Sequence, residues 1–144
     1  MAKPHTLYLR KAQLPDQATL QAAINALKFK LVVEVEYATL VATIPNNAYL
    51  PCVIVGEDGG VTARLQPILR PLTELPQIEA ALDDRDIAIK LGSGGDPRED
   101  ACMFILAGVF ATSFAAIVQL GDKDEVLSAE ALCKKARSSV AELD

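Results

Sequence analysis

A run of 20 residues without a charged side chain, from Ala101 to Leu120, constrains this sequence more than any other feature. Its length is about that of a helix that crosses a bilayer, ~20 residues. However, small and polar residues dilute its apolar side chains, acidic residues flank both of its ends, and the chain contains no tryptophan. Membrane spans usually have lysine or arginine on the cytoplasmic side and aromatic residues at the interfaces. The run therefore predicts a helix buried on all sides in a protein core, with no membrane partner.

The residues before this run carry a helix start signal. Asp96 is a favoured N-cap residue, Pro97 suits the first helical position, and Glu99 stands where a capping box forms. The glycine-rich loop 92–95 is of the kind that binds phosphate at a helix N-terminus. Here the acidic side chains would repel a phosphate, and they complement the helix dipole instead. We therefore predict a capped helix over 96–120 rather than a phosphate site.

Hydrophobic periodicity and turn residues predict the other elements. Strands are expected over 6–10, 30–37, 40–44, 52–55, 61–65 and 86–91, and helices over 17–28, 73–82 and 128–140. Residues 57–60 are expected to supply the turn of a hairpin, and Thr73 to cap the second helix. Whether 30–37 and 40–44 form a hairpin or one long strand stays open at this point.

The resulting order of elements is β-α-β-β-β-β-α-β-α-α. Consecutive strands favour antiparallel pairing, so the sequence predicts an α+β fold with a mostly antiparallel sheet covered by helices on one face. A chain of 144 residues is typical of one domain, and we expect residues 1–144 to form a single α+β domain.

The chain is acidic, with a net charge of −5 from 14 lysine and arginine residues against 19 aspartate and glutamate residues. A negative field repels phosphate backbones, so we expect no nucleic-acid partner, whereas a basic protein would be attracted. Cys52, Cys102 and Cys133 form no Cys-x-x-Cys pair, which is typical of buried, reduced thiols. Together with the lack of a signal-peptide pattern at the start, they predict a cytoplasmic protein.

Residue types that carry out chemistry are sparse. The single histidine, His5, lies near the start of the chain, where we expect it to be exposed and without the partner that a general base needs. The acidic clusters 83–86 and 122–125 lack EF-hand spacing, and the cysteines and histidine lack zinc-site spacing. We therefore expect no catalytic residue, no metal and no cofactor, and a protein that is not an enzyme.

Exposed acidic residues are better candidates for function. Glu34 and Glu36 share one face of the strand predicted over 30–37, opposite its apolar side chains. An acidic surface of this kind steers a cationic partner toward the protein. The residues expected to bind a basic partner are Glu34, Glu36, Asp58, Asp83, Asp84 and Asp86.

The C-terminal third of the chain resembles a known class of proteins. Its segments 96–102 (DPREDAC) and 121–132 (GDKDEVLSAEAL) flank the alanine- and glycine-rich helix. This third is similar to cytosolic immunity proteins of type VI secretion effectors, particularly those that neutralise nucleases. The resemblance implies a protein that covers a cognate toxin in a stoichiometric complex. A cytosolic secretion chaperone, which would form a homodimer, and a small carboxylate-based enzyme or small-molecule binder stay open as alternatives.

Overall fold

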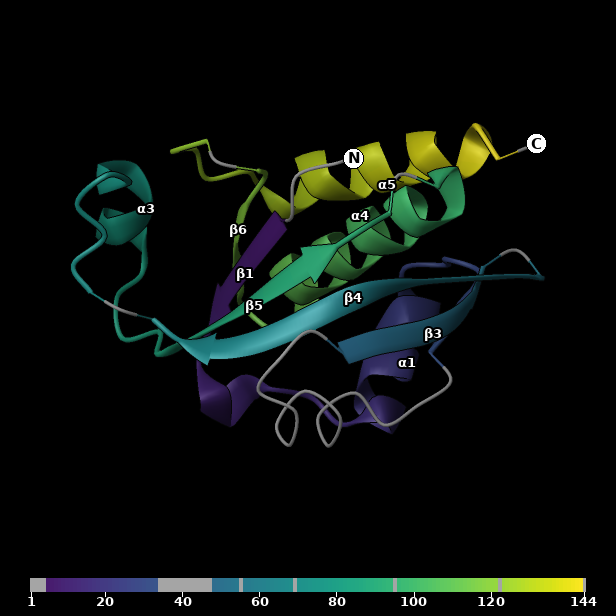
Figure 1. Ribbon diagram of the computed structural model, residues 1–144. Coiled ribbons are helices and arrows are strands. Elements are labelled where there is room, and N and C mark those ends of the chain that lie inside the picture. Colours follow the sequence, from purple (N-terminus) through teal and green to yellow (C-terminus); the bar gives the residue numbers. More distant parts are fainter. Residues whose placement is uncertain are drawn as a thin grey trace.

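The computed structural model describes residues 5–33, 48–54, 56–68, 70–94, 96–121 and 123–143. The strands are β1 (His5–Leu9), β2 (Leu31–Val33), β3 (Ala48–Ile54), β4 (Glu57–Pro67), β5 (Ile87–Gly92) and β6 (Ile117–Gln119). The helices are α1 (Gln17–Ala26), α3 (Pro76–Ala81), α4 (Pro97–Ser113) and α5 (Ala129–Ala141), with a 3-10 turn at Lys11–Gln13. The strands form one antiparallel sheet in the order β2-β3-β4-β5-β1-β6 (Figure 1). The predicted α+β fold with an antiparallel sheet is confirmed.

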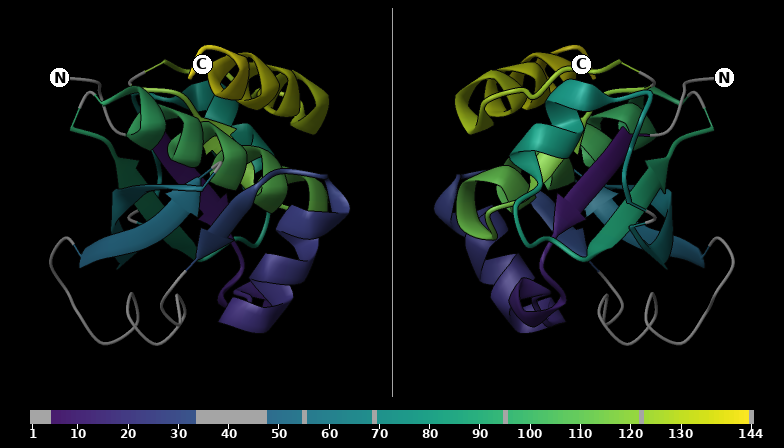
Figure 2. Two further views of the ribbon diagram at one scale, coloured as in Figure 1. Left: turned by 90° about the vertical axis from the view of Figure 1, so that its right-hand side faces the viewer. Right: turned by 90° about the vertical axis from the view of Figure 1, so that its left-hand side faces the viewer.

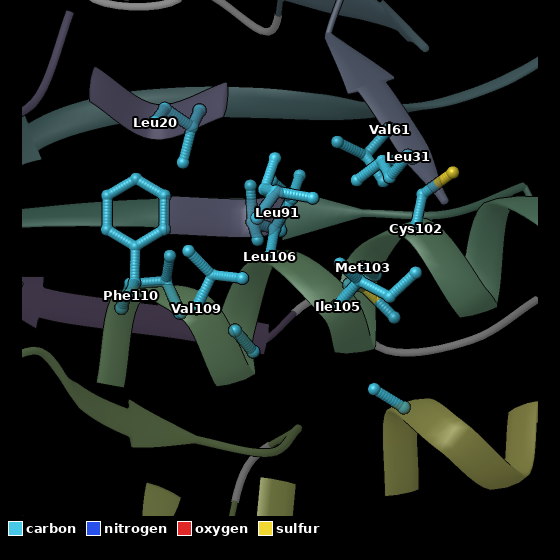
Figure 3. Packing of buried hydrophobic residues seen from close by; sticks show 14 of the residues in the cluster. Leu20, Leu31, Val61, Leu91, Cys102, Met103, Ile105, Leu106, Val109 and Phe110 are labelled. Carbon is cyan, nitrogen blue, oxygen red and sulfur yellow. The ribbon is translucent and has the colours of Figure 1, made fainter. Parts of the chain in front are cut away.

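Helix α4 lies between the sheet and α5, so this part of the molecule has three layers (Figure 2). Nine residues of α4 are buried, and all but Gly108 belong to the same core as Leu7 and Ile89 of the sheet and Leu132 of α5. Figure 3 shows part of this packing. The predicted buried helix is therefore confirmed over residues 101–110, where only Phe104 is partly exposed, whereas both ends of α4 reach solvent. Within the described residues, no helix combines the length and the apolar character needed to cross a membrane.

The buried helix ends earlier than the sequence predicts. It stops at Ser113, Ala115 has a φ of 55°, and residues 117–119 form β6, which pairs with β1. The Arg85 side chain holds this turn, because its Nε and Nη2 donate to the carbonyl oxygen of Ala115 at 3.1 and 2.8 Å. Short apolar segments suit a helix or a strand equally well. The predicted extension of the helix to residue 120 is therefore wrong, because contacts with Arg85 and β1 set the end of the helix.

The hairpin of β3 and β4 also differs from its prediction. Residues 57–60 belong to β4 and pair with β3, although the sequence predicts them as the turn. Two residues separate the end of β3 from the start of β4, and one of them, Gly56, has a φ of 80°, which glycine adopts without strain. The strand predicted over 40–44, and with it the choice between a hairpin and one long strand, lies outside the described residues.

Helix α3 covers part of the other face of the sheet. Tyr8 of β1 and Ala88 of β5 point away from α4 and form a second apolar cluster with Ile78 and Leu82. The expectation of helices on one face therefore holds for α1, α4 and α5 but not for α3. These outward apolar side chains would otherwise face water, and burying them is favourable.

A remote carboxylate caps α3. The sequence predicts Thr73 as the cap, but the N-cap residue is Leu75, whose side chain has no acceptor. Instead the two carboxylate oxygens of Asp124 accept hydrogen bonds from the backbone nitrogens of Gln77 and Ile78, each at 3.0 Å. Asp124 thus ties the segment before α5 to the start of α3.

Replacing Asp124 by alanine is expected to lower the free energy of unfolding by about 1–2 kcal/mol, because the first N–H groups of α3 lose their acceptors. Glu125→Ala, at the exposed neighbouring residue, is the control and should change stability by less than about 0.5 kcal/mol. Urea denaturation of both variants measures the difference. Equal effects of the two substitutions would contradict the capping role.

Candidate functional site

The acidic residues expected to bind a partner do not form one surface. Glu34 and Glu36 lie outside the described residues. Asp58 lies near the start of β4, whereas Asp83, Asp84 and Asp86 lie between α3 and β5, beside the other end of β4. At ~3.3 Å per strand residue, the two ends of β4 are about 30 Å apart.

The carboxylates of Asp83, Asp84 and Asp86 face cationic and N–H groups of this chain. Arg10 donates from Nε to Asp84 at 2.5 Å, and this hydrogen bond holds the pKa of Asp84 below its usual value. Asp86 accepts from the backbone nitrogen of Lys11 at 2.7 Å, and Arg85 lies 3.8 Å from Asp83. These neighbouring cations offset the negative charge here, which weakens any attraction for a basic partner.

A net negative surface forms at the opposite end of the sheet, where the β3–β4 hairpin meets the N-terminus of α4. Arg98 of α4 donates from Nε to the carboxylate of Glu57 at 2.5 Å, which joins the two elements. We call this surface the acidic end. Its charged residues on the side of α4 are Glu57, Asp96, Arg98, Glu99 and Asp100, and Asp58 adds a carboxylate on the other face of the same strand. Five carboxylates and one guanidinium give these six side chains a net charge of −4.

Hydrogen bonds hold most of these carboxylates in fixed positions. Asp96 accepts from the backbone nitrogen of Arg98 at 2.8 Å and so caps α4. Glu99 accepts from the backbone nitrogen of Gly94 at 2.7 Å, and Asp100 accepts from the Ser93 hydroxyl at 2.6 Å. A carboxylate has about four lone-pair sites, so each retains acceptor capacity toward a partner.

The sequence predicts only Asp58 among the carboxylates of the acidic end. Asp96 and Glu99 are recognised there as helix-capping residues, and Glu57 as part of a turn. Glu57 lies about 40 residues before Asp96 and Glu99 in the sequence, and the packing of α4 on β4 brings the two segments together. The acidic character of both segments is the one signal in the sequence that could have found them.

His5 is half-buried, although the sequence predicts it to be exposed. Its ring packs on Phe104 with centroids 5.3 Å apart, and its Nδ1 accepts from the backbone nitrogen of Gly121 at 3.0 Å. The carboxylate of Asp100, which is bound to Ser93, also acts on it electrostatically. In a Ser-His-Asp triad the histidine lies between the other two side chains, whereas here the serine donates directly to the aspartate.

Burial lowers the pKa of His5 below 6.5, and Asp100 and Lys135 act on it in opposite directions. As pH falls below about 6.5, the unfolded chain binds a proton that the folded chain does not, so the free energy of unfolding decreases. We expect His5→Gln to flatten the decrease between about pH 6.5 and 5. Urea titrations across this range test this, and an unchanged slope would contradict it. Carboxylates whose pKa is lowered, such as that of Asp84, change the free energy of unfolding only below about pH 4 and so do not affect this range.

Two shallow depressions lie away from the acidic end. One, of about 480 Å³, lies between α4 and α5 and is lined by Phe104, Ala131, Lys134, Lys135, Ser138 and Ser139. The other, of about 360 Å³, lies beside α3 and is lined by residues 71–75 and Gln119, with Glu74 as its one carboxylate. Neither has the converging carboxylates that a carboxylate-based small-molecule site requires. In the described part of the chain, no three His, Cys, Asp or Glu side chains are placed to hold a metal ion.

The chain matches no protein-family model, no curated protein and no solved structure.

Proposed function

We propose that this protein is a non-catalytic binding protein that neutralises a basic partner by forming a stoichiometric complex. The observation that carries the proposal is the acidic end, where five carboxylates from two elements are offset by Arg98 alone within the group. The partner that fits best is a cognate bacterial toxin, as for the immunity proteins that the C-terminal third resembles. Such a protein would act in the cytoplasm.

Electrostatics makes a nuclease toxin a suitable partner. A nuclease binds a polyanion and therefore presents a basic cleft. An acidic surface that complements it raises the association rate constant above the ~10⁵–10⁶ M⁻¹s⁻¹ of unsteered pairs. Carboxylates already fixed by internal hydrogen bonds, such as those of Asp96 and Glu99, lose little conformational freedom on binding.

The acidic end is the principal binding surface in this proposal, and Asp58 is one of its exposed members. Asp58 is exposed and forms no ion pair with any described residue. Asp83, Asp84 and Asp86 would contribute less, because Arg10 and Arg85 lie beside them. Roles for Glu34 and Glu36 stay a prediction from the sequence.

Co-expression tests the proposal. The product of the adjacent open reading frame should stop growth when expressed alone, and co-expression of this protein should restore growth. Light scattering of the purified pair should give a complex with equal numbers of the two chains. Absence of toxicity, or restored growth without a complex, would contradict the proposal. A dimer of this chain that binds an extended segment of a non-toxic partner would indicate a secretion chaperone instead.

A further inference from the structure

Two of the three cysteines face each other between the sheet and α4. Cys52 on β3 and Cys102 on α4 are both buried, with at most 1% of either exposed. Cys102 projects from α4 toward the strands (Figure 3). The third, Cys133, lies on α5, where its Sγ is 3.7 Å from the hydroxyl of Thr112. The sulfur atoms are thus divided between two interfaces of α4.

A glycine lies beside the first two thiols. Cys52 pairs directly with Gly59 of β4, and a Cβ built on Gly59 would lie 3.4 Å from the Sγ of Cys102. The Cys102 sulfur therefore lies beside the residue that pairs with Cys52. The thiols of Cys52 and Cys102 lie within hydrogen-bonding reach of each other. A disulfide between them requires their Cβ atoms to lie ~3.5–4.5 Å apart.

The thiols also interact with each other. A hydrogen bond with the Cys52 thiol lowers the pKa of the Cys102 thiol, against the opposing effect of burial. The backbone of Gly60 acts in the same direction as Cys52. A lowered pKa increases the thiolate fraction, and the thiolate is the nucleophile in thiol oxidation. Burial and the nearby Glu99 carboxylate oppose this shift, but its net direction favours Cys102 as the attacking sulfur.

We propose that Cys52 and Cys102 are a redox-active dithiol that a peroxide oxidises to a disulfide joining β3 to α4. The Cys102 thiolate attacks one peroxide oxygen, the O–O bond breaks, and a sulfenic acid and water form after proton transfer. The Cys52 sulfur then attacks the sulfenic sulfur, the S–S bond forms, and a second water leaves. Two thiols lose two electrons, and one hydrogen peroxide is reduced to two waters. This inference does not rest on the proposed function.

The disulfide would lie next to the acidic end. A Cβ built on Gly59 would also lie 3.6 Å from the Cβ of Arg98, the residue that binds Glu57. Oxidation would therefore attach the hairpin covalently to α4 at the same place where this ion pair joins them. The cross-link would close a loop of about 50 residues, which stabilises a folded chain mainly by restricting the unfolded one.

Mild oxidation of the folded protein tests the inference. The reduced protein is treated with hydrogen peroxide without denaturant, alkylated, and analysed by intact mass and peptide mapping. We expect loss of two hydrogen atoms, a peptide linking Cys52 to Cys102, and a rise in melting temperature of about 5–10 °C. Reduction should reverse all three changes.

Substitutions of single cysteines test which thiols form the disulfide. Cys133→Ser should form the disulfide as readily as the wild type, whereas Cys52→Ala should instead add oxygen atoms to Cys102. Thiols that stay intact, a sulfinic acid at Cys102 of the wild type, a disulfide to Cys133, or a disulfide that forms only in denaturant would each overturn the inference. The wild-type result decides the matter even where a variant fails to fold.

Discussion

Phe110→Ala is expected to lower the free energy of unfolding by about 4 kcal/mol, the largest effect of any single substitution proposed for this protein. Phe110 is 1% exposed, and its ring lies 5.4 Å from that of Phe114. Because α4 is held between the sheet and α5, the surrounding layers are unable to close the cavity left by the ring. Urea denaturation followed by circular dichroism measures the loss.

Phe104 provides a matched control on the same helix. Its side chain is half-exposed beside the depression between α4 and α5, so Phe104→Ala removes less buried area. We expect a loss of about 1–2 kcal/mol for this variant. Equal losses for the two phenylalanines would contradict the three-layer arrangement around α4.

Charge reversal at the acidic end is expected to have the largest effect on binding. The double variant Glu57→Lys/Asp58→Lys should weaken complex formation with the toxin about 10- to 100-fold, because it brings the net charge of the acidic end from −4 to 0 and so removes the attraction. Co-expression with the toxin should then fail to restore growth. Glu74→Lys/Glu125→Lys changes the net charge equally at exposed residues elsewhere and should restore growth as well as the wild type. Circular dichroism of both variants establishes that they are folded.

The burial and the start of α4 could be predicted because both depend on local signals. The uncharged run 101–120 requires an apolar environment, and Asp96 with Pro97 starts a helix whatever lies around it. The end of α4 depends instead on distant groups. Arg85 binds the carbonyl oxygen of Ala115, and β1 offers an edge for β6, so the last apolar residues extend as a strand.

The acidic end was harder to predict for a similar reason. In the sequence, 83–86 is a denser acidic cluster than the segment around Asp58. The fold brings Arg10, 74 residues away, to Asp84 and offsets that charge. It also places Glu57 beside the first turn of α4, where the capping carboxylates add to its charge. Local sequence shows where acidic residues are, but tertiary packing decides which groups of them keep a net negative charge.

The association rate constant of the complex tests the central claim most directly. Stopped-flow mixing of the toxin with the wild type and the two double variants should be carried out at low and at high salt. We predict fast, strongly salt-dependent association for the wild type and the control variant, and slow, nearly salt-independent association for Glu57→Lys/Asp58→Lys. The same rate constant and the same salt dependence for all three proteins would contradict a binding role for the acidic end.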